Sequence, residues 1–153
     1  MKCLIVDTQA DRLDDSMIGF LDAGLQVMGT SSLQVAQAYV RRSEIDVLVF
    51  DQSLRSSPQI QLVRAAEVRN TGLITLVISS DVAREADILT QAYPSVHCIL
   101  GEDVDPRLVA KLALASLAEK TETAHSKRTL TQRQVHPMSA PVFHSARAEV
   151  RAA

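Results

Sequence analysis

The sequence is poor in aromatic residues, in cysteine and in net charge. Of its 153 residues only 3% are aromatic and none is tryptophan, so a core drawn from its 46% hydrophobic residues must be aliphatic. The formal net charge of −2 argues against a protein that binds nucleic acid over its whole surface. Cys3 and Cys98 lie in apolar runs without metal-binding spacing, which favours buried free thiols in a reducing compartment.

Several functional segments are also missing. The apolar stretch at the N-terminus, MKCLIVDT, is too short for a signal peptide or a membrane span, so we expect a cytoplasmic protein with no membrane partner. The sequence contains neither GxGxxG nor a P-loop. A small flavin-binding or nucleotide-binding enzyme is therefore an alternative that no motif supports, and we expect that the chain is not an enzyme.

Five apolar runs have the length and composition of buried parallel strands. They cover residues 2–6, 25–28, 47–50, 73–78 and 96–100. Each run is followed by an amphipathic stretch with helix-start residues, at Asp11, Ser31 or Ser32, Pro58, Asp81 and Pro106. Strand–helix alternation with short connections predicts an α/β fold, a flavodoxin-like doubly wound sheet of five parallel strands.

Polar side chains stand where three of these runs end. The run CLIVD closes at Asp7, IDVLVFD closes at Asp51, and LITLVIS closes at Ser79. Because the carboxyl ends of parallel strands line the ligand crevice of such a sheet, we expect these side chains to converge on one small acidic pocket. The fifth run is followed by Gly101 and Glu102, so no cation is expected at that strand end.

The composition changes near Thr121. The following residues are polar and basic and lack a long apolar periodicity. We therefore predict two parts, a domain over residues 1–120 and a flexible basic linker or tail over residues 121–153.

With the pocket in place, the order of residues 1 to about 120 resembles the receiver domain of two-component response regulators. The stretches that carry the resemblance are LIVDT, LVFD and VIS, which end the first, third and fourth runs. The resemblance implies that Asp51 is the phosphoacceptor, that Ser79 is the switch hydroxyl, and that Asp7, Asp51 and the Ser53 backbone carbonyl hold Mg²⁺. It also implies a histidine kinase or phosphotransfer protein as partner, and a homodimer through the last helices.

The sequence departs from the receiver pattern at several of these positions. Thr8 replaces the second acidic residue, Gly101 replaces the lysine after the fifth strand, and Cys98 stands where an aromatic residue is common. These changes predict weak or absent Mg²⁺ binding, with Arg55 as a candidate substitute cation. Two hypotheses remain open. One is a phosphorelay receiver modified on Asp51, and the other is a pseudo-receiver that binds proteins without phosphorylation.

A second resemblance lies in the tail. Residues 130–135, LTQRQV, resemble the opening of a LuxR-type helix-turn-helix domain, which follows many receivers. Pro137 and Pro141 would break a helix there, and too few residues follow for the bundle. The alternative interpretation is a chance match in a polar tail, and on either interpretation we expect no DNA binding from this chain.

Overall fold

A computed structural model of the chain describes residues 1–52 and 57–133, with the side chains of 57, 58, 60 and 125–133 left aside. Within these described residues, five strands and five helices alternate. They are β1 (Lys2–Val6), α1 (Ala10–Asp22), β2 (Gln26–Thr30), α2 (Leu33–Arg42), β3 (Val47–Asp51), α3 (Ser57–Arg69), β4 (Ile74–Ser79), α4 (Val82–Ala92), β5 (Val96–Gly101) and α5 (Pro106–Arg133). The predicted alternation is confirmed.

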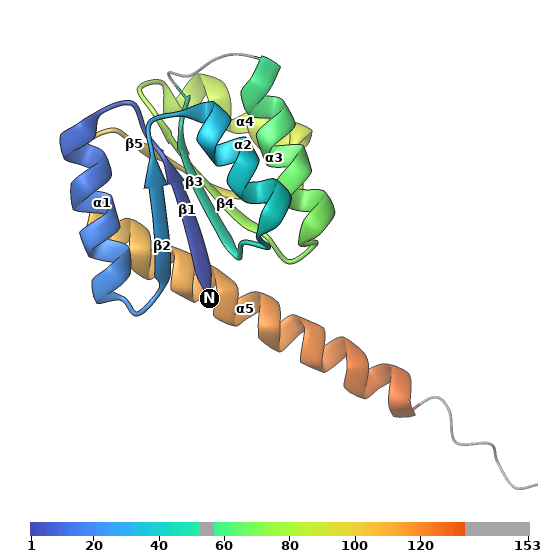
Figure 1. Cartoon of the computed structure of the whole chain (residues 1–153). Coiled ribbons are helices and arrows are strands. Elements are labelled where there is room, and N and C mark those ends of the chain that lie inside the picture. The colour runs from blue at the N-terminus through green and yellow to red at the C-terminus, as the bar shows by residue number, and fades with distance from the viewer. Residues whose placement is uncertain (53–56, 134–153) are drawn as a thin grey trace, which may run out of the picture.

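All strand pairs in the sheet are parallel, and the strand order is β2-β1-β3-β4-β5. The order reverses direction after β1, so β1 and β3 lie side by side at the centre. Right-handed crossovers then place α1 and α5 on one face and α2, α3 and α4 on the other, as Figure 1 shows. This is the flavodoxin-like doubly wound sheet that the sequence predicts.

Two aliphatic clusters fill the space between the sheet and its helices. The cluster beneath α2, α3 and α4 includes Leu4, Leu48 and Leu62, and the cluster beneath α1 and α5 includes Ile5, Phe20 and Val109. Alternate residues of β1 feed opposite clusters because side chains alternate across a strand. Strands that are buried on both faces explain the near-continuous apolar runs.

Local helix signals account for most of the boundaries. The Asp81 side chain caps α4 by accepting a hydrogen bond from the Arg84 backbone N–H at 3.2 Å. The Ser32 hydroxyl caps α2 in the same way, by accepting the Val35 backbone N–H at 3.4 Å. Gly24 follows α1 with a φ of +86°, the left-handed conformation that glycine adopts most readily. The helix predicted to open at Asp11 begins one residue earlier, at Ala10.

Helix α5 differs most from the prediction. It spans 28 residues, about 42 Å at 1.5 Å per residue, and continues past the sheet (Figure 1). Residues 121–133, predicted to be irregular, are helical. Residues 134–153 lie outside the described part of the chain, and so does the C-terminal end of the LTQRQV stretch. Within the described residues, no helix is long and apolar enough to cross a membrane.

Candidate functional site

The two aspartates predicted from the strand ends lie next to each other. Asp7 directly follows β1 and Asp51 is the last residue of β3, and the two strands pair through Val6 and Phe50. Only 3% of Asp7 and 1% of Asp51 is exposed to solvent. Two carboxylates buried this deeply at one sheet edge need a positive partner, because an unpaired charge is costly away from water.

That partner is Arg12 of helix α1, a residue that sequence reasoning missed. Its Nε donates to Asp7 Oδ2 at 2.5 Å and its Nη2 donates to Asp7 Oδ1 at 3.0 Å. Nη2 also donates to Asp51 Oδ2, so one guanidinium bridges both carboxylates. Nη1 lies 4.0 Å from Glu102 Oε1 at the pocket rim. The side chain of Arg12 is only 14% exposed.

The turn between β1 and α1 brings Arg12 into the pocket. Asp7 Oδ1 accepts the Gln9 backbone N–H at 2.8 Å, which fixes the chain as it enters the helix. Arg12 is in the first turn of α1, and helical side chains slope toward the helix N-terminus, back over the strand end. The hydrogen bond to Asp7 raises the pKa of Arg12, with further support from the Asp51 and Glu102 charges against the effect of burial. Arg12 therefore stays positively charged.

Ser79 also lies at this edge but is hydrogen-bonded within its own part of the pocket. Its hydroxyl donates to Glu85 Oε2 at 3.0 Å and accepts the Asp81 backbone N–H at 3.0 Å. Glu85, in the first turn of α4, is buried as well. A hydroxyl has one proton to donate, and Ser79 donates it to Glu85 rather than into the space beside Asp51.

The departures from the receiver pattern are visible at the fifth strand end. Gly101, the last residue of β5, pairs with Ser79 in the sheet, and a Cβ built there would meet Asp103 Oδ1 at 2.8 Å. Thr8 is exposed to solvent. Cys98 is half-buried in β5 and packs on the cluster beneath α1 and α5. Ser53 and Arg55, the predicted carbonyl ligand and substitute cation, lie outside the described residues.

The arrangement does not fit Mg²⁺. The guanidinium of Arg12 stands between the two carboxylates that the resemblance assigns as ligands, and it uses both oxygens of Asp7. A cation coordinated there would be held against a fixed positive charge. Among the described residues, no group of three or more histidine, cysteine, aspartate or glutamate side chains is arranged to hold a metal ion.

No protein-family model matches the chain, and no curated protein matches it. Solved structures do match the chain. A CheY-like response regulator receiver domain protein from Methanospirillum hungatei superposes with a TM-score of 0.68 at 18% identity, covering 80% of this chain and 97% of that one. An adenylate cyclase from Rhodopirellula baltica gives 0.66 at 15% identity, covering 87% and 98%.

An atypical orphan response regulator with a phosphorylation-independent regulatory mechanism gives a TM-score of 0.65 at 12% identity, covering 77% of this chain and 96% of its own. These neighbours differ in activity. At sequence identities this low, their structural similarity shows that this chain has the same architecture and says nothing of its activity. The chain has the CheY-like receiver fold.

Proposed function

We propose that this chain is a signalling module of the receiver fold that binds protein partners without being phosphorylated. One observation carries the proposal: the guanidinium of Arg12 bridges Asp7 and Asp51. A phosphoryl group on Asp51 would need a cation and free space at that carboxylate. In this pocket a side chain of the protein already supplies the positive charge and occupies the space between the carboxylates.

The position of Ser79 supports the same proposal. In a switching receiver, the hydroxyl after the fourth strand has to turn toward a new phosphoryl oxygen. Here the hydroxyl would first have to break its hydrogen bond to the buried Glu85 carboxylate. That carboxylate would then accept one hydrogen bond fewer, which costs free energy in a buried position. Both groups that would respond to phosphorylation are thus paired with residues of the protein itself.

The orphan response regulator among the structural neighbours is a precedent for this mode of action on the same fold. The partner surface that the receiver resemblance suggests is formed by α4, β5 and α5. It contains two of the exposed large apolar residues, Ile88 on α4 and Leu108 on α5, which are 63% and 48% exposed. An exposed apolar surface on a signalling module is suited to a protein partner.

A second candidate function is the phosphorelay receiver, with Asp51 phosphorylated by a histidine kinase or phosphotransfer protein. The observation that favours it is the grouping of Asp7, Asp51 and Ser79, each buried, at one edge of the sheet. For this function, Arg12 would have to leave the pocket before Asp51 could react.

The test is incubation with acetyl phosphate and Mg²⁺, followed by intact-mass measurement. We expect no added phosphoryl group on the wild type. Arg12→Gln, which removes the charge and keeps a polar side chain, is the matched variant, and Asp51→Asn controls for modification elsewhere. A phosphoryl adduct on the wild type that disappears in Asp51→Asn would favour the second candidate. An adduct on Arg12→Gln alone would identify Arg12 as the residue that blocks the site.

A further inference from the structure

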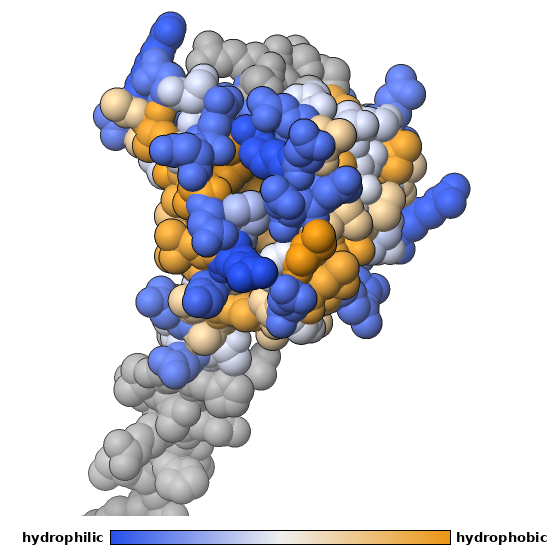
Figure 2. Space-filling model, turned by 90° about the vertical axis from the view of Figure 1, so that its left-hand side faces the viewer, coloured by the Kyte–Doolittle hydropathy of each residue, from blue (hydrophilic) through white to orange (hydrophobic). Residues whose placement is uncertain are grey.

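The outward face of helix α1 is acidic around an apolar centre. Helical spacing places six exposed residues on this face, which we call the acidic stripe: Asp11, Asp14, Asp15, Ile18, Leu21 and Asp22. Ile18 and Leu21 are 53% and 54% exposed. Figure 2, which views the molecule from the side of α1, shows apolar side chains set among hydrophilic ones. In the described part of the chain, none of the four aspartates forms an ion pair.

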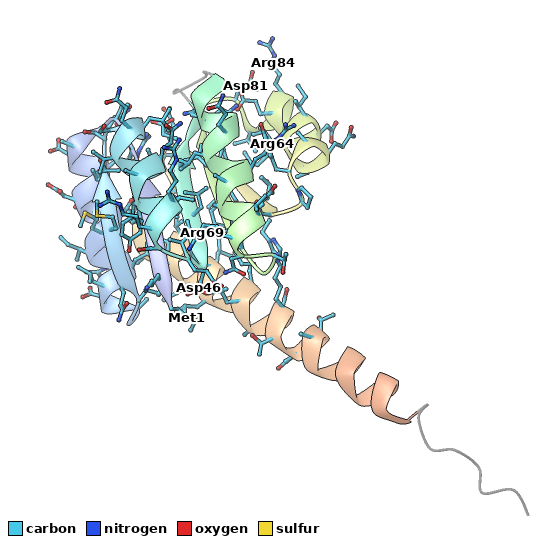
Figure 3. All side chains as sticks on the ribbon, turned by 45° about the vertical axis from the view of Figure 1, so that its right-hand side comes forward. Met1, Asp46, Arg64, Arg69, Asp81 and Arg84 are labelled. Carbon is cyan, nitrogen blue, oxygen red and sulfur yellow. The ribbon has the colours of Figure 1, made fainter. Side chains whose placement is uncertain are left out.

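Helix α3 has an outward face of opposite charge. Its exposed residues Arg64, Ala65, Val68 and Arg69 also follow helical spacing, and we call them the basic stripe. Val68 is 85% exposed, more than any other large apolar residue described. Figure 3 labels both arginines, Arg64 near the middle of α3 and Arg69 at its C-terminal end.

The arginines of the basic stripe are also uncompensated. Neither forms an ion pair with any residue that the structure describes. The one acidic residue of α3, Glu67, bonds instead with Ser95, accepting its backbone N–H at 3.0 Å and its hydroxyl at 2.6 Å. Arg41 and Arg42, exposed at the end of the neighbouring helix α2, add positive charge on this side.

We propose that the acidic stripe of one copy of this chain binds the basic stripe of a second copy. Each stripe has exposed apolar residues between charged ones, and the charges of the two stripes are opposite. They lie on helices that cover opposite faces of the sheet, so they cannot meet within one molecule (Figure 1). The association is therefore between copies and runs head to tail.

The charges also disfavour a two-fold dimer in which two copies of the same stripe face each other. Pairing two acidic stripes would bring aspartates together, and pairing two basic stripes would bring arginines together. A head-to-tail contact of one helix on another is small, so the association should be weak, dependent on concentration and screened by salt. Head-to-tail contacts propagate into rings or filaments rather than stopping at two copies.

Sedimentation of the full chain at increasing concentration tests the proposal. We expect the average mass of the wild type to rise at low salt and to fall toward the monomer near 1 M NaCl, where the Debye length is about 3 Å. Asp14→Lys with Asp15→Lys, and separately Arg64→Glu with Arg69→Glu, should each weaken association about tenfold or more. Circular dichroism and thermal unfolding establish that each variant is folded.

The decisive measurement mixes the two charge-reversed variants. Each variant alone has lost the charge complementarity at the substituted positions. In the mixture, contacts between unlike copies place the new lysines of one variant against the new glutamates of the other, so association should return. Leu108→Lys on α5, the exposed apolar residue of the alternative surface through the last helices, should leave association unchanged. A wild type that stays monomeric, a mixture that stays monomeric, or loss of association in Leu108→Lys would each overturn the proposal.

Discussion

The two ends of the parallel sheet both bury polar side chains, but they do so differently. At the amino end, Ser95 joins Thr75 and Glu67 through side-chain contacts of 2.8 and 2.6 Å, and Asn70 donates to the Ile45 carbonyl at 2.9 Å. These bonds join residues that are 20 to 28 positions apart in the sequence, two of the three are between neutral groups, and they hold the loops that enter the strands. At the carboxyl end, one arginine from a helix bridges two buried carboxylates at the ends of neighbouring strands.

The difference indicates what each end contributes. Hydrogen bonds that hold a loop add modestly to stability. A buried ion pair is a poor means of stabilisation because desolvation offsets much of its Coulomb energy. The charged end is therefore better explained by function, as a pocket whose state depends on whether Arg12 is in place, and that explanation can be tested against the amino end.

The largest expected effect comes from removing Arg12. Arg12→Ala leaves Asp7 and Asp51 buried side by side without a cation, which should lower the unfolding free energy by about 3–5 kcal/mol. Urea unfolding at pH 7 measures this loss. Arg84→Ala, which removes an exposed arginine from the first turn of α4, is the matched control and should change stability by less than about 0.5 kcal/mol.

A triple variant separates lost charge pairing from lost packing. Asp7→Asn and Asp51→Asn combined with Arg12→Met remove all three charges and keep most of the volume. This variant should recover at least half of the stability lost in Arg12→Ala. If the triple variant is as unstable as Arg12→Ala, the arginine matters for its contacts rather than for its charge, and the contrast between the two sheet ends loses its basis.

The architecture was predictable because periodicity and helix caps report on local structure. The five apolar runs, the Asp81 cap and the turn at Gly24 all lie where the pattern put them. The second half of α5 was not predictable from periodicity, since the helix continues past the sheet (Figure 1) and residues 121–124 are exposed. Its helix propagates from the packed first half, which lowers the cost of adding further turns.

The pocket was predictable only in part. Asp7, Asp51 and Ser79 could be grouped because strand ends in a parallel sheet share one edge. Arg12 was missed because a cation was sought at the fifth strand end or, as Arg55, in the loop after β3, whereas it comes from the first turn of the helix after β1. Its spacing of five residues from Asp7 was the available signal. Glu85 gave none, because a glutamate in a first helical turn usually faces solvent.

The second largest effect is expected at the other half of the pocket. Ser79→Ala removes the hydroxyl that donates to the buried Glu85 carboxylate, and bonds to charged groups contribute about 1.5–3 kcal/mol. Thr75→Val, the control at the amino end, removes only the neutral bond between the Thr75 and Ser95 hydroxyls and should cost about 1 kcal/mol. Equal losses in parallel denaturation curves would count against a special role for the charged end.

A pH-dependent effect is expected from the amino half of β1. Burial raises the pKa of the Cys3 thiol, so the folded protein keeps its proton at a pH where the unfolded chain loses it. The stabilisation is complete below the ordinary thiol pKa of about 8.5 and falls as pH rises above it, by about 1.4 kcal/mol per pH unit. Arg12, whose pKa is raised, stays charged in this range.

Unfolding free energies between about pH 8 and pH 10 measure this loss, which should total about 2 kcal/mol at the upper limit. Cys3→Val removes the ionisable group and should flatten the profile, while the half-buried Cys98→Ala should keep it. An unchanged slope in Cys3→Val would instead assign the alkaline instability to another group.

The smallest expected effect is the response of the wild type to Mg²⁺. A ligand that binds only the folded state stabilises it by RT ln(1 + [L]/Kd). Because Arg12 occupies the pocket, the Tm of the wild type should be the same in about 10 mM MgCl₂ as in NaCl of equal ionic strength. Arg12→Ala should gain a Mg²⁺-dependent increase in Tm, because the guanidinium no longer bridges the two carboxylates and a hard cation can approach them. Adding Asp7→Asn to Arg12→Ala should abolish that gain. A clear Mg²⁺ shift in the wild type would mean that Arg12 gives way to the metal, which would place the pocket closer to a phosphoacceptor site than to a sealed ion pair.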